Sequence, residues 1–197
     1  MRIQSSNLAI LMLAIFLIVP AGAETAPSTL KIVCTTSVLM DPATYIGGDR
    51  VEAISIADPT LCPHLQTDII PNRIQLNMDF IKDANMFMAY NDSNDQRYNM
   101  PAINDFMTAN NYGTAEWMTI SNPSRGWNTP TNSKLLAAEV EGWLANKDPA
   151  NKTYYEQRYN DYAKSFDAIE PTESEKKQLN QTQVIVSHAI VHPTAHD

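Results

Sequence analysis

Short apolar runs rich in β-branched residues alternate with stretches of helical spacing along the first half of the chain. The runs cover residues 30–36, 51–57 and 86–90, and the helical stretches between them reach to about residue 46 and span residues 74–84. Strands that alternate with helices over so short a distance predict parallel pairing with right-handed crossovers. We therefore expect an α/β fold in which helices flank a parallel sheet.

The second half of the chain continues the alternation and then becomes more helical. Residues 99–110 and 133–146 are predicted helices, and residues 115–120 are a predicted fourth strand. Asp148-Pro149 ends the second of these helices and begins another, because an acidic N-cap followed by Pro is typical of a helix start. A long polar helix is predicted over residues 152–178, and residues 183–187 are a further strand. The helix carries aromatic residues at helical spacing, interpreted as a packing face: Tyr154, Tyr155, Tyr159, Tyr162 and Phe166.

The N-terminus has the order of regions found in a secretory signal peptide. Arg2 precedes an apolar run over residues 8–19, and Ala21-Gly22-Ala23 provides small residues for cleavage. The run is shorter than the roughly 20 residues needed to span a bilayer. We expect residues 1–23 to direct export, which gives a periplasmic or cell-surface protein, and retention as an uncleaved membrane anchor is the alternative.

Charge and motif content narrow the classes of function. The formal net charge of −8 argues against nucleic acid or anionic lipid as a partner. The chain has no Ser-His-Asp order with a nucleophile turn, no Gly-rich phosphate loop and no H-E-x-x-H motif, so we do not expect an enzyme. Cys34 and Cys62 permit one disulfide, but Cys34 also suits a buried strand as a small apolar residue.

Several short motifs follow the predicted strands in a fixed order. They are Thr35-Thr36-Ser37, the turn Gly48-Asp49, Cys62-Pro63-His64, Tyr90-Asn91 and the later Asp148-Pro149-Ala150-Asn151. In this order and spacing, the chain from residue 30 to about residue 188 resembles the metal-binding solute receptors of zinc and manganese ABC transporters, the cluster A-I periplasmic binding proteins.

The resemblance implies a two-lobed receptor whose lobes are joined by one long helix, with a metal ion between them. Residues 24–150 would form the N-terminal α/β lobe, residues 151–180 the linking helix and residues 181–197 the start of a truncated second lobe. The implied function is capture of zinc or manganese by a monomer that delivers the ion to an ABC transporter permease in the membrane.

The resemblance also implies a ligand set of three His and one carboxylate. His64 corresponds to the first ligand, and His188 to the one that follows the first strand of the second lobe. Neutral imidazole suits zinc-class ions. Ser124 stands where the second His is expected, in Asn122-Pro-Ser-Arg-Gly-Trp127, and its hydroxyl is a poor zinc ligand.

The sequence allows alternatives for its C-terminal histidines and for its function. His192 and His196 follow His188 at intervals of four residues, which would align them on a helix, but Pro193 would interrupt that helix. They therefore either bind metal or belong to an unstructured terminus. The function has alternatives too: a surface adhesion or interaction scaffold, or a receptor for another ligand such as a metal chelate, which would account for Ser124.

Overall fold

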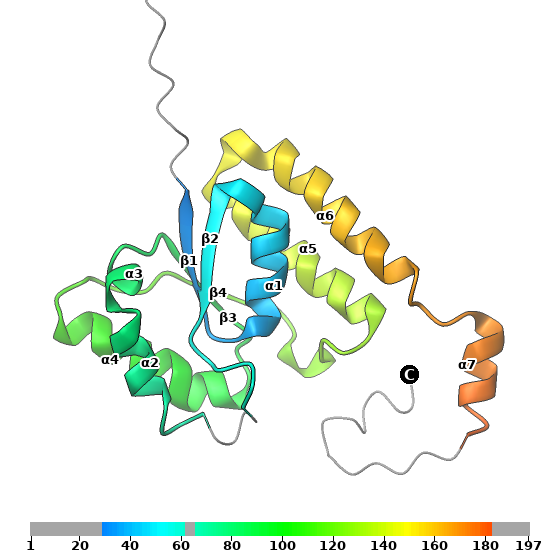
Figure 1. Ribbon diagram of the computed structural model, residues 1–197, viewed down its shortest axis with the longest axis horizontal. Coiled ribbons are helices and arrows are strands. Elements are labelled where there is room, and N and C mark those ends of the chain that lie inside the picture. Colours follow the sequence, from blue (N-terminus) through cyan, green and yellow to red (C-terminus); the bar gives the residue numbers. More distant parts are fainter. Residues whose placement is uncertain (1–28, 62–65, 183–197) are drawn as a thin grey trace, which may run out of the picture.

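A four-stranded, fully parallel sheet forms the centre of the molecule (Figure 1). The computed structural model describes residues 29–61 and 66–182. The strands are β1 (Leu30–Cys34), β2 (Val51–Ser55), β3 (Met86–Ala89) and β4 (Trp117–Thr119), in the order β2-β1-β3-β4. Residue Leu30 of β1 pairs with Val51 of β2, and β3 pairs with β1 and β4. The predicted parallel α/β sheet is confirmed.

Helices cover both faces of this sheet (Figure 1). One face carries α1 (Ser37–Gly47), α5 (Pro130–Lys147) and α6 (Lys152–Asp167), and the other carries α2 (Ile70–Leu76), α3 (Met78–Lys82) and α4 (Met100–Ala109). Short turns join them: η1 (Gly48–Arg50), the π-helical η3 (Asp95–Asn99), η4 (Pro123–Arg125) and η5 (Pro149–Asn151). The last helix is α7 (Glu173–Leu179).

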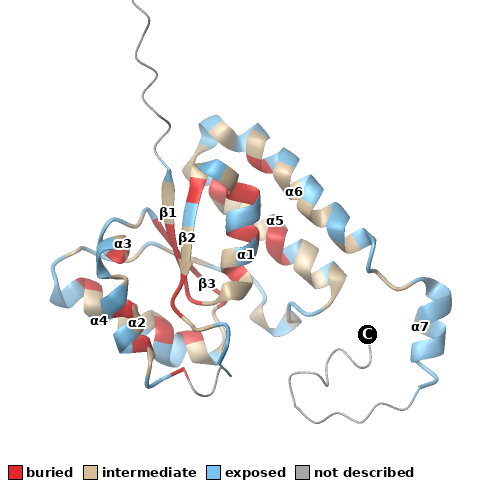
Figure 2. Cartoon of the chain, in the orientation of Figure 1, coloured by how far each residue is buried: buried red, intermediate tan, exposed pale blue. Residues whose placement is uncertain are grey.

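The sheet separates two apolar cores, because successive side chains of a strand point to opposite faces. Ile32 and Cys34 of β1 belong to the core under α1, α5 and α6, whereas Val33 belongs to the core under α2, α3 and α4. Figure 2 shows the buried residues concentrated on the sheet and on the helix faces turned toward it. Cys34 is a free thiol in the apolar role that its strand predicts, and burial raises its pKa. Cys62 lies outside the described residues.

The predicted helix over residues 152–178 is wrong in extent, because the structure has two helices there. α6 ends at Asp167 and α7 begins at Glu173. Pro171 lacks an N–H and disfavours a helical conformation in the residue before it. Thr172 then starts a new helix with a capping box: its hydroxyl accepts the Glu175 N–H at 3.3 Å, and the Glu175 carboxylate accepts the Thr172 N–H at 2.8 Å.

The aromatic stripe of α6 is a packing face, as predicted. Tyr155 is fully buried, and Tyr154, Tyr159 and Tyr162 pack against the same core. Tyr162 also contacts the ring of Phe166, with centroids 5.1 Å apart. The stripe therefore attaches α6 to the lobe.

Two predicted segments, the signal peptide over residues 1–23 and the strand over residues 183–187, lie outside the described residues. Within residues 29–61 and 66–182, no helix is both long enough and apolar enough to cross a membrane.

Candidate functional site

A cavity of about 260 Å³ opens at the edge of the sheet where the strands end. Its walls come from the segments after β1, β2 and β3, with Trp127 added from the segment after β4. In open parallel sheets, ligands bind beyond the carboxyl ends of the strands at the point where the strand order reverses. Here that point lies between β1 and β3, since the chain places β2 on one side of β1 and β3 on the other.

A buried carboxylate joins the ends of β1 and β3 at the wall of this cavity. Asp95 is fully buried and accepts hydrogen bonds from the Thr35 hydroxyl (2.8 Å) and the Asn91 N–H (2.8 Å) at Oδ2. The Asn99 side-chain amide donates to Oδ1 at 2.7 Å. Burial raises the pKa of Asp95, and these three hydrogen bonds oppose that rise. The arrangement fixes the spacing of the two strand ends at the site.

The segment after β3 has an irregular backbone that brings Asp95 into place. Asn91 has a φ of 64°, a left-handed conformation that Asn tolerates better than most residues. Asp92 Oδ1 accepts the N–H groups of Asn94 and Asp95, each at 2.9 Å. The next turn is the π-helix η3, a type of turn that occurs frequently at functional sites.

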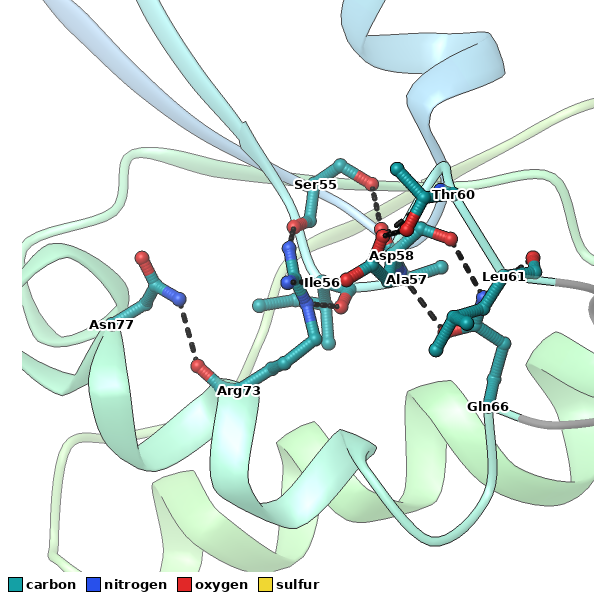
Figure 3. A network of polar contacts seen from close by, with 9 residues as sticks. All are labelled: Ser55, Ile56, Ala57, Asp58, Thr60, Leu61, Gln66, Arg73 and Asn77. Atoms are coloured by element: carbon teal, nitrogen blue, oxygen red, sulfur yellow. Dashed lines mark hydrogen bonds and ion pairs between the residues drawn. The ribbon is translucent and has the colours of Figure 1, made fainter.

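The segment after β2 is held by Arg73, which reaches back from α2 (Figure 3). Its guanidinium donates to the carbonyl oxygens of Ser55 (3.0 Å) and Ile56 and to Asp58 Oδ2 (3.3 Å). Asp58 Oδ1 accepts the Thr60 N–H at 2.9 Å and the Thr60 hydroxyl at 2.6 Å. Hydrogen bonds from Thr60, with the charge of Arg73 adding to them, lower the pKa of Asp58, so this carboxylate is ionised at neutral pH.

Gln66 closes the same segment from its far end (Figure 3). Its Oε1 accepts the Asp58 N–H at 2.9 Å, and its Nε2 donates to the carbonyl oxygens of Asp58 (2.7 Å) and Leu61 (3.1 Å). Only 7% of Gln66 is exposed. Leu61 and Gln66 both line the cavity, and they are the described residues on either side of the segment 62–65.

The predicted metal ligands His64 and His188 lie outside the described residues, as do His192 and His196. Ser124 is exposed in η4 and is not among the residues that line the cavity. Within residues 29–61 and 66–182, no three His, Cys, Asp or Glu side chains come together in a way that could hold a metal ion.

The described lining of the cavity is acidic, with an apolar rim. Asp58, Asp92 and Asp95 contribute carboxylates, and no Lys or Arg is among the described lining residues. Leu61, Tyr98 and Trp127 are exposed large apolar side chains that also line the cavity. This lining favours a cation over an anion. Sequence reasoning missed Asp95 and Gln66, and the only signal for Asp95 was a run of Asx residues directly after a buried strand.

Comparison with known proteins gives one family and several relatives. The sequence model of the family described as "ZnuA: Zinc-uptake complex component A periplasmic" matches residues 32–197. The manganese ABC transporter substrate-binding lipoprotein PsaA of Streptococcus anginosus is 23% identical over 168 residues, which cover 77% of this chain and 53% of PsaA. The chain thus spans about half the length of that curated relative. The description of the matching family concerns zinc uptake and names neither a scaffold nor a receptor for a metal chelate.

Solved structures resemble the described fold at low sequence identity. A zinc-bound deletion mutant of ZnuA has a TM-score of 0.62 at 19% identity, and the match covers 85% of this chain and 66% of the ZnuA chain. Zn(II)-bound AdcA from Streptococcus pneumoniae has a TM-score of 0.61 at 16% identity, with 85% of this chain and 37% of AdcA covered. The periplasmic zinc binding protein TroA from Treponema pallidum has a TM-score of 0.55 at 15% identity, with 78% and 56% covered. At these identities the similarity concerns the fold.

Proposed function

Because the chain belongs to the family of periplasmic zinc-uptake components, we propose that it captures a transition-metal ion, zinc or manganese, for an ABC transporter. The observation that carries this proposal is the acidic cavity at the carboxyl edge of the parallel sheet. It stands where such sheets bind ligands, and its described lining has three carboxylates and no basic side chain. The role is binding and delivery rather than catalysis.

The proposed ligands from this chain are His64 and His188. Support for His64 comes from its neighbours, since Leu61 and Gln66 on either side of its segment line the cavity. Imidazole nitrogen is the commonest metal ligand of proteins and suits zinc-class ions. Ser124 is exposed and has a neutral hydroxyl, so we propose that it does not coordinate the ion.

The cellular arrangement follows from delivery to a permease. A receptor that feeds a membrane permease must meet it on its outer face, so we propose that residues 1–23 direct export and that the protein acts as a monomer outside the cytoplasmic membrane. Residues 24–150 would be the first lobe, residues 151–180 the connection and residues 181–197 the beginning of the second lobe.

Isothermal titration of residues 24–197 with zinc and with manganese tests this proposal. We expect binding of one ion per chain, tighter for zinc than for manganese because zinc stands higher in the affinity order for nitrogen ligands. His64→Ala and His188→Ala should each weaken zinc binding by about 10-fold or more, on the scale of about 1.4 kcal/mol per tenfold change. His196→Ala removes an imidazole outside the proposed pair and serves as the control.

Two results would contradict the proposal. One is the absence of zinc and manganese binding at millimolar concentrations of either ion. The other is zinc binding by His64→Ala that equals the wild-type value, since the ion would then be held elsewhere.

A further inference from the structure

We infer that Gln66 and Arg73 are positioning residues for metal capture, which hold the two flanks of the segment that carries His64. This inference rests on the proposed function. We call Asp58, Gln66 and Arg73 together the flank clamp. Figure 3 shows their contacts.

The first part of the flank clamp joins α2 to the end of β2. Arg73 donates to two backbone carbonyls, those of Ser55 and Ile56, and to the Asp58 carboxylate. A guanidinium offers five N–H donors in a rigid planar fork, so one side chain satisfies all three acceptors. The ion pair itself is partly exposed and contributes little energy. The contacts to the backbone therefore matter more, because they fix the direction in which the chain leaves β2.

The second part brings the two flanks together. Gln66 uses its carbonyl oxygen and its amide nitrogen at once, accepting the Asp58 N–H and donating to the carbonyl oxygens of Asp58 and Leu61. Glu would have no donor for those two carbonyls, and Asn would be one methylene too short. A side chain that is 7% exposed and fully hydrogen-bonded holds a defined position. Leu61 and Gln66 are consequently kept at hydrogen-bond distance.

The position of the flank clamp points to the site rather than to the core. Asp58, Leu61 and Gln66 line the cavity, while the apolar core beneath α2 is made by other residues, including Ile70 and Ile74. A ligand whose two flanks are already fixed loses less conformational entropy when it binds an ion. Removal of polar groups that hydrogen-bond directly to a metal ligand typically changes affinity by about 10–100-fold. Gln66 and Arg73 act on the backbone beside the ligand, so the lower end of that range applies to them.

A double-mutant cycle with His64 tests this role in the chain of residues 24–197. Zinc affinity is measured by competition with a chromophoric chelator, and the thermal transition is recorded without metal. We expect Gln66→Ala to weaken zinc binding by about 10-fold, at the lower end of the range for such supporting groups, and Arg73→Lys to weaken it as well. In the His64→Ala background, Gln66→Ala should cause no further loss, since a positioning residue acts through the group it positions.

Two matched controls separate the flank clamp from general effects of substitution. Gln75→Ala removes a side-chain amide from α2, the helix that carries Arg73. The Gln75 amide contacts Met78 Sδ and no part of the flank clamp. Arg158→Lys removes an arginine that donates to the Tyr45 carbonyl oxygen at 2.7 Å, between α6 and α1. Both should leave zinc affinity unchanged. If Gln66→Ala lacks a cooperative thermal transition, Gln66→Glu keeps the size of the side chain and removes the two donated hydrogen bonds.

The outcomes distinguish this inference from the proposed function. Equal losses of zinc affinity on Gln66→Ala in the wild-type and His64→Ala backgrounds would overturn positioning and leave a purely structural role. A loss on His64→Ala with none on Gln66→Ala or Gln66→Glu would refute the flank clamp alone. No loss on His64→Ala would refute the proposed function itself.

Discussion

Asp95 is the only Asp or Glu among the described residues that is buried. It lies fully buried between the ends of β1 and β3 and accepts hydrogen bonds from Thr35, Asn91 and Asn99. Burial raises its pKa above the ordinary value of 3.8. A buried acceptor with three donors should contribute strongly to the local structure, since its loss leaves those donors without a partner.

Replacement of Asp95 by Asn should therefore destabilise the fold in a pH-dependent way. The raised pKa means that the native state holds this proton more tightly than the unfolded state, so the group's contribution is greatest below the unfolded pKa and falls as pH rises through the folded pKa. Asp95→Asn does not titrate. The free energy of unfolding of this variant should lie about 1–3 kcal/mol below that of wild type under acidic conditions. This difference should shrink as pH rises.

Urea unfolding of wild type and Asp95→Asn between about pH 4 and about pH 7 measures this deficit. A deficit that grows with pH would contradict the direction of the pKa shift. Thr35→Val, which removes one donor and leaves the titrating carboxylate, is the control. Because the Thr35 hydroxyl opposes the rise in the Asp95 pKa, this variant should keep a pH dependence of the same sign as that of wild type, and at least as large.

Some of the site could be predicted residue by residue, and some could not. The loop after β2 was expected to carry a ligand because the family resemblance assigns His64 to that role, and ligands of open parallel sheets bind at the strand ends. The contact between Thr35 and Asp95 joins positions 60 residues apart, and no local pattern indicates it. Nothing in the sequence distinguishes Gln66 and Arg73 from other polar residues. Their roles arise because the chain folds back so that α2 lies beside the end of β2.

Hydroxyl groups of the α6 stripe add polar contacts to its apolar packing. Tyr154 donates to Asp49 Oδ1 at 2.8 Å, and Tyr162 donates to Asp41 Oδ2 at 2.6 Å. Gly48, with a φ of 53°, makes room for this packing, because a Cβ there would lie 2.2 Å from the Tyr154 hydroxyl oxygen. The α1–α6 contact is therefore specific in geometry as well as apolar.

Tyr155 tests how much one such hydroxyl contributes to the attachment of α6. It is fully buried and donates to Asp148 Oδ2 at 2.8 Å. Tyr155→Phe should lower the free energy of unfolding by about 1–2 kcal/mol, because a buried hydrogen bond to a charged acceptor is lost. Tyr159→Phe, on the same stripe but with no hydroxyl bond to the described residues, should cost less. Denaturant unfolding compares the two variants, and equal costs would mean that the hydroxyl contributes nothing specific.

The capping box at Thr172 should control the local stability of α7. This helix has no buried residues, so little besides the cap opposes its opening. Thr172→Ala should destabilise it by about 1 kcal/mol, which corresponds to roughly fivefold faster amide hydrogen exchange over Glu173–Leu179. The exchange of α5 amides serves as the internal control. Unchanged exchange in α7 would show that something other than the cap stabilises it.

At the level of elements, the sequence predicted the kinds of structure better than their ends. The β-branched runs and helical spacing placed all four described strands and the helices between them. The expected helix over residues 152–178 overlooked Pro171 and the Thr172-x-x-Glu175 pattern, both of which are readable helix signals. The expected helix over residues 74–84 is wrong in extent. The structure has two helices, of which α2 begins earlier, at Ile70, and they are joined at Asn77, where the sequence has no strong helix breaker.

The whole molecule presents an acidic site on an acidic chain. The formal net charge is −8, and the described lining of the cavity contributes three carboxylates without a basic side chain. Such a surface raises the local concentration of cations around the site at low ionic strength. Capture of a divalent ion is consistent with the electrostatics of the molecule as well as with its fold and family.

We propose that the ion binds at the carboxyl edge of the sheet with His64 as a ligand. Nuclear magnetic resonance of the ¹⁵N-labelled chain of residues 24–197, titrated with zinc, tests it most directly. We expect chemical-shift changes concentrated on the His64 imidazole and on the amides of cavity residues such as Thr36, Asp58 and Gln66, and we expect these changes to be lost in His64→Ala. Shifts confined to residues 183–197, or cavity shifts that persist in His64→Ala, would contradict it.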